Sequence, residues 1–200
     1  MENEEKRALA VTVLRGSPSH DLLCQPLGYL FADHFRQRIL CQVFDDVADA
    51  DVVDRSLAEV AVQFLKDDFG LHILDEEEDL FPMLRLRARP EDKVDSLLAQ
   101  LSEEHTADGI DASDIVKCLS IHLKGTGDFV ITDYLRELLK RFAANERQHI
   151  ILENAIILPL AEGLLSAQDL RQIGESMSAR RNIKYADLSP LPAGGGTLNV

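Results

Sequence analysis

Apolar side chains recur along most of this chain at intervals of three and four residues, which is the period of an amphipathic helix. Four long segments carry this pattern, at residues 26–47, 54–87, 91–123 and 131–165. The sequence shows no alternating strand pattern of useful length, apart from a few apolar residues near 11–14. Long amphipathic helices joined by short connections predict an all-α fold, an up-down-up-down four-helix bundle.

Breaks in the pattern indicate how the chain is organised. Gly125 and Gly127 predict a loop before the fourth helix. The pair Asp108-Gly109 predicts a weak point within the third helix. Ser166 is a favourable N-cap for a short fifth helix at 167–181, which we expect to pack across the bundle or to form a dimer contact. The expected regions are a flexible lead-in, the bundle, and a C-terminal helix with a flexible tail, at 1–19, 20–165 and 166–200.

The composition is that of an acidic globular protein. The 200 residues are 46% hydrophobic and 28% charged, which is enough for one domain with a substantial core. The formal net charge is −14 and the pI is about 4.8. Arg171, Arg180 and Arg181 form the one modest basic cluster of the sequence. Because nucleic acids and anionic membrane surfaces attract basic patches, neither is an expected partner.

The spacing of the cysteines and the length of the apolar segments indicate the cellular compartment of the protein. Cys24, Cys41 and Cys118 are widely spaced and form no CxxC motif, which fits a reducing compartment better than a disulfide framework. Neither a signal peptide nor an apolar run of about 18 residues is visible. We therefore expect a cytoplasmic protein without a membrane span.

Two short stretches share one arrangement of polar residues. In each, a histidine precedes a glutamate by four positions, as His72 precedes Glu76 and His149 precedes Glu153. This spacing places both side chains on one face of a helix, one turn apart. The imidazole and the carboxylate can then bind one metal ion together, or the carboxylate can bridge to a second ion. Two such pairs on two helices indicate a candidate dinuclear site.

Each long segment carries one histidine near the middle of its apolar stripe. The stripes are Leu27, Leu30, His34, Cys41 and Phe44; Leu65, Phe69, His72, Glu76, Leu80 and Met83; Val94, Leu98, Leu101, His105, Ala112 and Leu119; and Leu135, Leu138, Phe142, His149, Glu153, Ile156 and Leu160. Burying an unpaired carboxylate is costly, and a cation among the histidines would stabilise both glutamates. Such ligands suit Fe, Mn or Zn. The alternative for any one histidine is a buried imidazole that only satisfies hydrogen bonds.

Other polar residues near the stripes have simpler interpretations. Glu146 precedes His149 by three residues, the spacing of ferritin-like di-iron motifs, but the second such pair that those motifs need is missing. Glu146 is then an acceptor for a ligand histidine or, as we rather expect, a solvated glutamate. The acidic run 77–79 is expected on a solvated face. His20 and His122 are expected to be surface or capping residues.

At these positions the chain resembles the hemerythrin-like (HHE cation-binding) family over residues 20–165. The matching pieces are Ala32-Asp-His34, His72-Ile-Leu-Asp-Glu-Glu-Glu-Asp-Leu-Phe-Pro82, Glu103-Glu-His105 and His149-Ile-Ile-Leu-Glu-Asn-Ala-Ile-Ile-Leu-Pro-Leu-Ala161. The resemblance implies a four-helix bundle around a non-haem di-iron centre. It implies that Glu76 and Glu153 bridge the two irons. The terminal ligands that it implies are His34, His72, His105 and His149.

The chain departs from the oxygen-carrying members of that family. Those proteins have two histidines four apart on the third helix, whereas Leu101 and Gly109 stand four residues from His105. Asn154 follows Glu153, where an acidic run is missing. A set of four histidines and two glutamates looks more like the bacterial iron-centre repair proteins and related sensors. Fewer protein ligands leave more open positions for water, O2, NO or peroxide.

The resemblance and the ligand set together predict a di-iron protein that senses O2, NO or redox state, or that handles iron, including the repair of damaged iron centres. Mn and Zn are alternative metals. A homodimer and an iron-receiving protein are further expected partners. Two rival hypotheses are a di-iron enzyme of peroxide or NO chemistry, for which the stripes offer no dedicated proton donor, and a metal-free helical interaction module.

Overall fold

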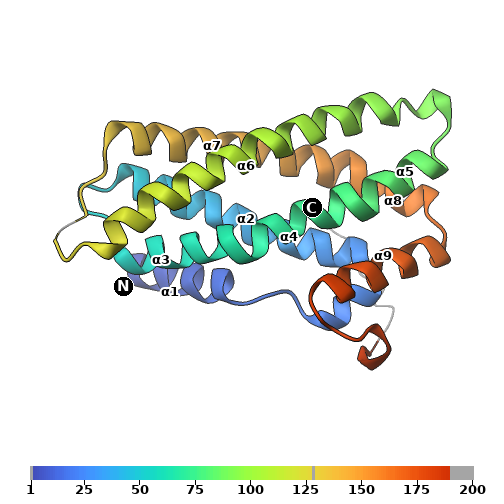
Figure 1. The fold of residues 1–200 in the computed structure, drawn as a ribbon, viewed down its shortest axis with the longest axis horizontal. Coiled ribbons are helices and arrows are strands. Elements are labelled where there is room, and N and C mark those ends of the chain that lie inside the picture. Colours follow the sequence, from blue (N-terminus) through green and yellow to red (C-terminus); the bar gives the residue numbers. More distant parts are fainter. Residues whose placement is uncertain (1, 128, 190–200) are drawn as a thin grey trace.

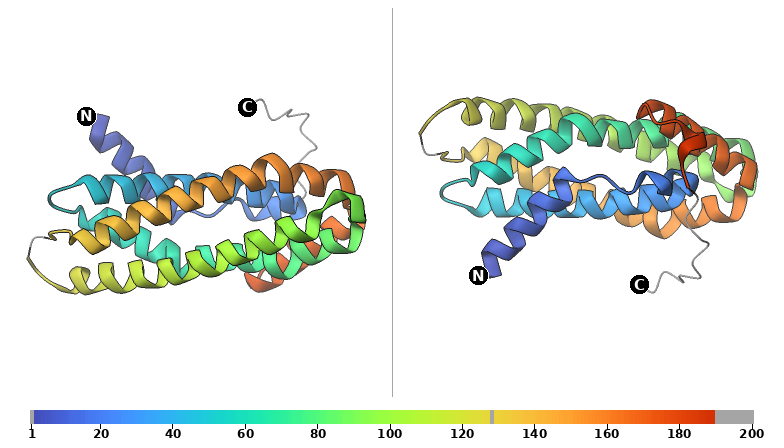
Figure 2. Two further views of the ribbon diagram at one scale, coloured as in Figure 1. Left: turned by 90° about the horizontal axis from the view of Figure 1, so that it is seen from above. Right: turned by 90° about the horizontal axis from the view of Figure 1, so that it is seen from below.

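The computed structural model describes residues 2–127 and 129–189, and all regular structure in these ranges is helical. Four rods lie side by side along the long axis of the molecule (Figures 1 and 2). The first rod is α2 (Pro26–Asp49) and the third is α6 (Val94–Lys124). The second and fourth rods each join several helical elements without a break.

The second rod alternates α-helical and π-helical turns, and the fourth contains one π-helical turn. The elements of the second rod are α3 (Arg55–Phe64), η2 (Leu65–Phe69), α4 (Gly70–Leu74), η3 (Asp75–Leu80) and α5 (Phe81–Arg87). Those of the fourth are α7 (Asp133–Leu152), η5 (Glu153–Ile157) and α8 (Leu158–Leu164). The shorter elements are η1 (His20–Cys24), η4 (Pro90–Asp92), α9 (Ala167–Arg180) and η6 (Tyr185–Asp187).

The all-α prediction is confirmed, and local caps explain why the rods begin close to their predicted positions. The Asp54 carboxylate accepts a hydrogen bond of 2.8 Å from the backbone N–H of Ser56, and the Thr132 hydroxyl caps α7. Ser166 and Asp169 form a capping box at the start of α9, as the sequence predicted. None of the helices in the described part of the chain is long and apolar enough to cross a bilayer.

The third rod continues through residues 108–109, where a weak point was predicted. The Asp108 side chain is buried inside the molecule, and Gly109 is exposed. A glycine within a helix lowers stability by only about 1 kcal/mol. Packing of α6 along α3 and α7 outweighs that effect.

Residues 2–15 form a helix, α1 (Glu2–Arg15), rather than the irregular lead-in expected for residues 1–19. This helix packs against α2 and α3, and Leu14 is buried there. The Arg36 guanidinium donates to the backbone carbonyls of Val13 and Leu14 at 3.4 and 3.3 Å. These acceptors at the end of a helix have no partner within it. Because Arg36 lies far along the chain, local patterning did not reveal this stabilisation.

Buried apolar side chains form two separate clusters within the rods. One cluster includes Phe44, Phe64, Phe69 and Phe142, and the other includes Leu30, Phe81, Leu101 and Ile157. Along each rod, buried polar residues lie between the members of the two clusters, within 33–37, 72–76, 105–108 and 146–153. A buried polar layer therefore divides the core, and it contains every residue predicted to bind metal.

The C-terminal helix α9 packs against η1, α2 and η3 at one end of the rods (Figure 1), the first of its two expected placements. Ile173 and Met177 are buried in this contact. Gly174 lies so close to η1 that a Cβ atom would meet the carbonyl oxygen of Leu23 at 2.2 Å. The flexible tail expected at 190–200 lies outside the described residues.

Gly174→Ala is expected to lower the melting temperature by roughly 5 °C. Overpacking of this kind destabilises by about 1–3 kcal/mol, and each kcal/mol shifts the melting temperature of a chain this long by about 2–4 °C. Gly163→Ala is the matched control, because no atom lies within 4 Å of its Cβ position, and its melting temperature should be unchanged or higher. Thermal unfolding followed by circular dichroism measures both. Equal melting temperatures for Gly174→Ala and the wild type would contradict the close packing of α9.

Candidate metal centre

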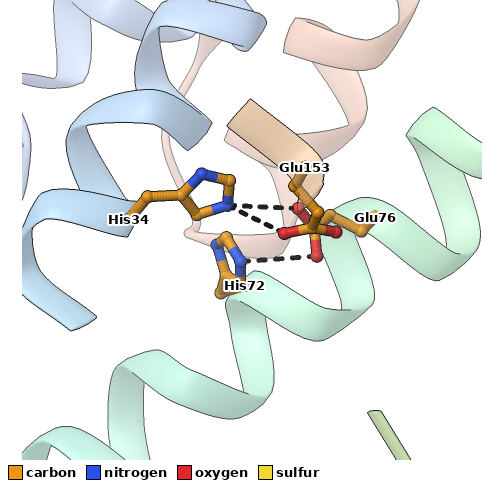
Figure 3. Close-up of side chains that lie close together, drawn as sticks. All are labelled: His34, His72, Glu76 and Glu153. Carbon is orange, nitrogen blue, oxygen red and sulfur yellow. Dashed lines mark ion pairs between the residues drawn. The ribbon is translucent and has the colours of Figure 1, made fainter. Parts of the chain in front are cut away.

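The six residues predicted as metal ligands meet in the polar layer. His34 comes from α2 and His105 from α6, and the two HxxxE pairs come from the second and fourth rods. Ligand atoms form two groups, each within 4.8 Å: His34, His72, Glu76 and Glu153, and Glu76, His105, His149 and Glu153. Figure 3 shows the first group, with both carboxylates facing the rings. Both glutamates belong to both groups, so each group offers two imidazoles and two carboxylates to a cation.

The two oxygens of Glu153 face different histidines. Its Oε2 lies 3.2 Å from Nε2 of His34, and its Oε1 lies 3.3 Å from Nε2 of His149. These histidines belong to different groups. The orientation is therefore the one required of a carboxylate that gives one oxygen to each of two ions.

Glu76 contacts three histidines, and one of its oxygens faces histidines of both groups (Figure 3 shows two of the three). Its Oε1 lies 3.5 Å from Nε2 of His34, and its Oε2 lies 3.3 and 3.2 Å from the Nε2 atoms of His72 and His105. Two ligands that bind one ion at about 2.1 Å, with angles of about 90–110°, lie roughly 3.0–3.4 Å apart. The contacts of Glu76 Oε2 fall within this range, and the contact of Oε1 with His34 is slightly longer.

Buried polar atoms without hydrogen-bond partners test whether a cation fits here. Among the described residues they include Nε2 of His34, His105 and His149 and all the carboxylate oxygens of Glu76 and Glu153. These side chains are almost completely buried, so the unpaired atoms destabilise the fold unless a ligand satisfies them. Cations would satisfy these imidazole nitrogens and carboxylate oxygens together, and the mixed set suits Fe, Mn or Zn. In the same part of the chain, Nδ1 of His72 and Nε2 of Gln37 are also without a hydrogen-bond partner and point to no cation. The residues fit the metal centre that their spacing predicted.

The opposite ring nitrogen of each histidine, Nδ1, faces an acceptor from another part of the chain. The hydrogen-bonded pairs are His34 with Asn154 at 2.8 Å, His105 with Glu77 at 2.7 Å and His149 with Glu104 at 2.9 Å. Nδ1 of His72 lies 3.3 Å from Oδ2 of Asp33, a longer contact. A proton held on Nδ1 leaves the Nε2 lone pair free to bind metal. The acceptors thus orient all the rings inward.

Both candidate bridging glutamates lie in π-helical turns. Glu76 is in η3, and Glu153 begins η5. Six residues after each glutamate, Pro82 and Pro159 lie in the first turn of the next α-helix. Proline has no N–H to donate and clashes with the preceding turn of a regular helix, and a wider π turn accommodates it. The same local arrangement therefore repeats at both glutamates.

The π turns also shift the apolar stripe that regular spacing predicted. Ile156 was expected in the core but is 45% exposed, and its neighbour Ile157 is fully buried. In the second rod, Met83 is only half-buried, whereas Leu84 is fully buried. One extra residue in a helical turn rotates all later side chains about the helix axis. The predictions that Met83 and Ile156 lie in the core are therefore wrong by one position.

Charge in the centre is balanced between imidazoles and carboxylates. Burial opposes the charged form of His149, but the Glu153 carboxylate outweighs it and raises the pKa of His149 to about 10. Burial likewise opposes the charge on His105, and Glu76 raises its pKa to about 9. Burial favours protonated Glu76, yet His72 and the other imidazoles lower its pKa well below the usual value. A bound cation would replace protons in this network, so metal uptake would release protons.

The solvated positions expected for two nearby glutamates are wrong. Glu146 is only 2% exposed, because it lies on the inner face of α7, and the acceptor for His149 is Glu104 rather than Glu146. Glu77 is partly buried and accepts from His105. Glu77 lies beside Glu76 in the π turn η3. Regular helical spacing would not place both side chains toward the core, so the sequence pattern gave no signal for Glu77.

The acidic run also receives the basic residues of α9. Asp75, which is fully buried beside Glu76, accepts from both Arg180 and Arg181, and Arg180 also pairs with Asp79. Of the run 77–79, only Glu78 is exposed. Charges of the predicted basic cluster are therefore neutralised within the molecule.

The other two histidines lie away from the centre. His20 is exposed at the start of η1. His122 bonds to the backbone carbonyl of Cys118 near the end of α6, and its ring stacks on Phe129. Neither belongs to a metal group among the described residues, in line with the surface or capping roles expected for them.

Comparison with known proteins identifies the region that carries the centre. A family model described as the hemerythrin HHE cation binding domain matches residues 25–161, which include all the predicted ligands. A protein of Haemophilus influenzae, whose name assigns it no function, is 26% identical over 167 residues, covering 80% of this chain and 92% of that protein. No solved structure gives a significant match.

Proposed function

The chain belongs to the hemerythrin HHE cation-binding domain family, and from this we propose that it binds two iron ions within an up-down-up-down four-helix bundle. Iron is the first choice among metals, with Mn and Zn as alternatives for the same ligands. The proposed role is sensing of O2, NO or redox state, or iron handling that includes the repair of damaged iron centres.

One observation carries the proposal: both buried glutamates are shared by two groups of ligands. Each group also has two histidines, so each ion has His34 with His72, or His105 with His149, as its own ligands. A single ion would leave one pair of imidazoles without a partner. Two ions would use the unpaired Nε2 atoms of His34, His105 and His149 and all four carboxylate oxygens of Glu76 and Glu153.

The number of protein ligands supports a reactive or exchangeable centre. Two imidazoles and two shared carboxylates leave an iron ion with positions for water or a small ligand. Bound iron would supply redox chemistry and binding of O2, NO or peroxide. Open positions also make release of iron to another protein feasible, which supports the iron-handling role.

A di-iron enzyme of peroxide or NO chemistry is the second candidate, and one observation favours it. Burial raises the pKa of Glu146 to about 7, and the nearby His149 partly offsets this effect. A carboxyl group with such a pKa can donate or accept a proton near neutral pH. Glu146, which is buried one helical turn before His149, would be the proton donor that the apolar stripes did not offer.

Metal content tests the proposal. Protein purified from iron-supplemented cells should contain close to two irons per chain and show oxo-bridged charge-transfer bands in the ultraviolet–visible spectrum. Absence of bound metal, including after anaerobic addition of Fe(II), would refute the metal centre and favour the interaction module. Turnover of peroxide or NO above that of free iron would favour the enzyme over the sensor or iron-handling protein.

A further inference from the structure

A surface groove of about 560 Å³ opens beside one half of the centre. It lies between α6 and the fourth rod, which carry His105 and His149. Glu104 and Asp108 line it on the α6 side. Glu104 extends from this groove to the centre, because its side chain is 36% exposed while its Oε2 accepts from His149.

Two further acids lead inward from the groove without a partner. Asp108 lines the groove although it is only 2% exposed, and Glu146 is equally buried. Neither side chain has a hydrogen bond or an ion pair to any residue in the described part of the chain. Asp108 and Glu146 interact electrostatically, and Glu146 interacts with His149 and Glu153 in the same way. Glu146 is buried on α7 one helical turn before His149, so it lies on the same face of that helix as the ligand.

Acids on the opposite side of the centre are neutralised. Asp33, which faces His72, pairs with Arg36 at 2.7 Å, and Asp68 pairs with the same guanidinium at 3.2 Å. Asp75 is held by Arg180, the last residue of α9, and by Arg181, which follows it. His34 and His72 are sealed from solvent there. On this side the carboxylates are already held by guanidinium groups and are not free to bind an approaching cation.

We propose that the groove and the acids Glu104, Asp108 and Glu146 form the path by which a divalent cation enters and leaves the His105/His149 half of the centre. The inference rests on the proposed metal centre and specifies the side from which the cation reaches it. Unpaired carboxylates in a low-dielectric passage attract a cation strongly and hold it only briefly when they are too few to complete its coordination. The ion between His105 and His149 therefore exchanges first, and the ion between His34 and His72 is retained longer.

Metal uptake and release rates test the path. Metal-free protein is mixed with Co(II) in a stopped-flow instrument, and the loaded protein is then mixed with excess EDTA. Asp108→Asn and Glu146→Gln are expected to slow uptake and the faster phase of release about tenfold, within the range by which charged clefts change association rates. The final amount of bound Co(II) and its absorption spectrum should stay those of the wild type.

Asp68→Asn is the matched control, because it removes an acid from the opposite side and should change both rates less than twofold. Wild-type rates in Asp108→Asn and Glu146→Gln, or equal slowing in Asp68→Asn, would overturn the path while leaving the metal centre intact. Loss of bound Co(II) at equilibrium in either groove variant would also overturn it, because the residue would then be a ligand. A wild-type protein that binds no metal would refute the proposed function itself.

Discussion

Glu76→Ala and Glu153→Ala are each expected to lose both metal ions rather than one. Each carboxylate belongs to both ligand groups, so its removal leaves each ion with two histidines and one carboxylate oxygen. Removing a group that only supports a metal ligand already weakens binding about 10–100-fold, and loss of a direct, shared ligand should exceed that. Mass spectrometry of metal content and the loss of oxo-bridge absorption measure the effect.

Glu78→Ala is the control for these variants. Glu78 lies in the same π turn as Glu76, but it is exposed and contacts Arg180 at the surface. It should keep the wild-type metal content and spectrum. If Glu76→Ala and Glu153→Ala both retain two ions per chain, the bridging assignment is wrong, and each ion would have to be held by other groups.

The rods and the meeting of the six candidate ligands in one layer could be predicted because they follow from short-range periodicity. A histidine and a glutamate four residues apart share a helix face whatever the rest of the fold is. A buried carboxylate also requires compensation in any fold, so the position of Glu76 and Glu153 inside apolar stripes was informative in itself. The predicted ends of the long helices differ from the observed ends by only a few residues.

The partners of the ligand histidines could not be predicted in the same way. Glu77 reaches His105, and Glu104 reaches His149, only because of the rotation of one rod against another. Asn154 looked like a missing acid in the sequence, yet it accepts from Nδ1 of His34. Such contacts depend on packing between rods that are distant in sequence, and the period of one helix contains no information on them.

The π turns account for most remaining differences in the fourth rod. A regular helix through Glu153 would bury Ile156, but the wider turn buries Ile157 instead. Pro159 is the visible signal, because proline within a helical pattern marks a departure from regular hydrogen bonding. Position alone did not show whether the helix would end, bend or widen there. Widening is favoured because it keeps the rod continuous on both sides of the metal ligands.

Arg181→Met is expected to lower the free energy of unfolding by about 3 kcal/mol and the melting temperature by roughly 6–12 °C. Asp75 is fully buried, and Arg181 donates to it while also bonding to the Tyr29 hydroxyl at 3.0 Å and stacking on that ring. Removing one partner of a buried ion pair leaves the other charge poorly compensated, although Arg180 still contacts Asp75. Arg171→Met, at an exposed position of the same helix, should be close to neutral.

The same substitution is expected to weaken metal binding, and this effect separates a role in the centre from simple docking of α9. Asp75 immediately precedes Glu76 in η3, so a displaced Asp75 moves the backbone that positions a shared ligand. A double variant, Arg181→Met with Asp75→Asn, removes both charges and should recover much of the lost stability. Metal affinity should recover together with stability only if the two uncharged side chains of the double variant allow η3 to regain its wild-type backbone position. Wild-type melting and metal affinity in Arg181→Met would show that the arginine contributes to neither, and that Arg180 alone compensates Asp75.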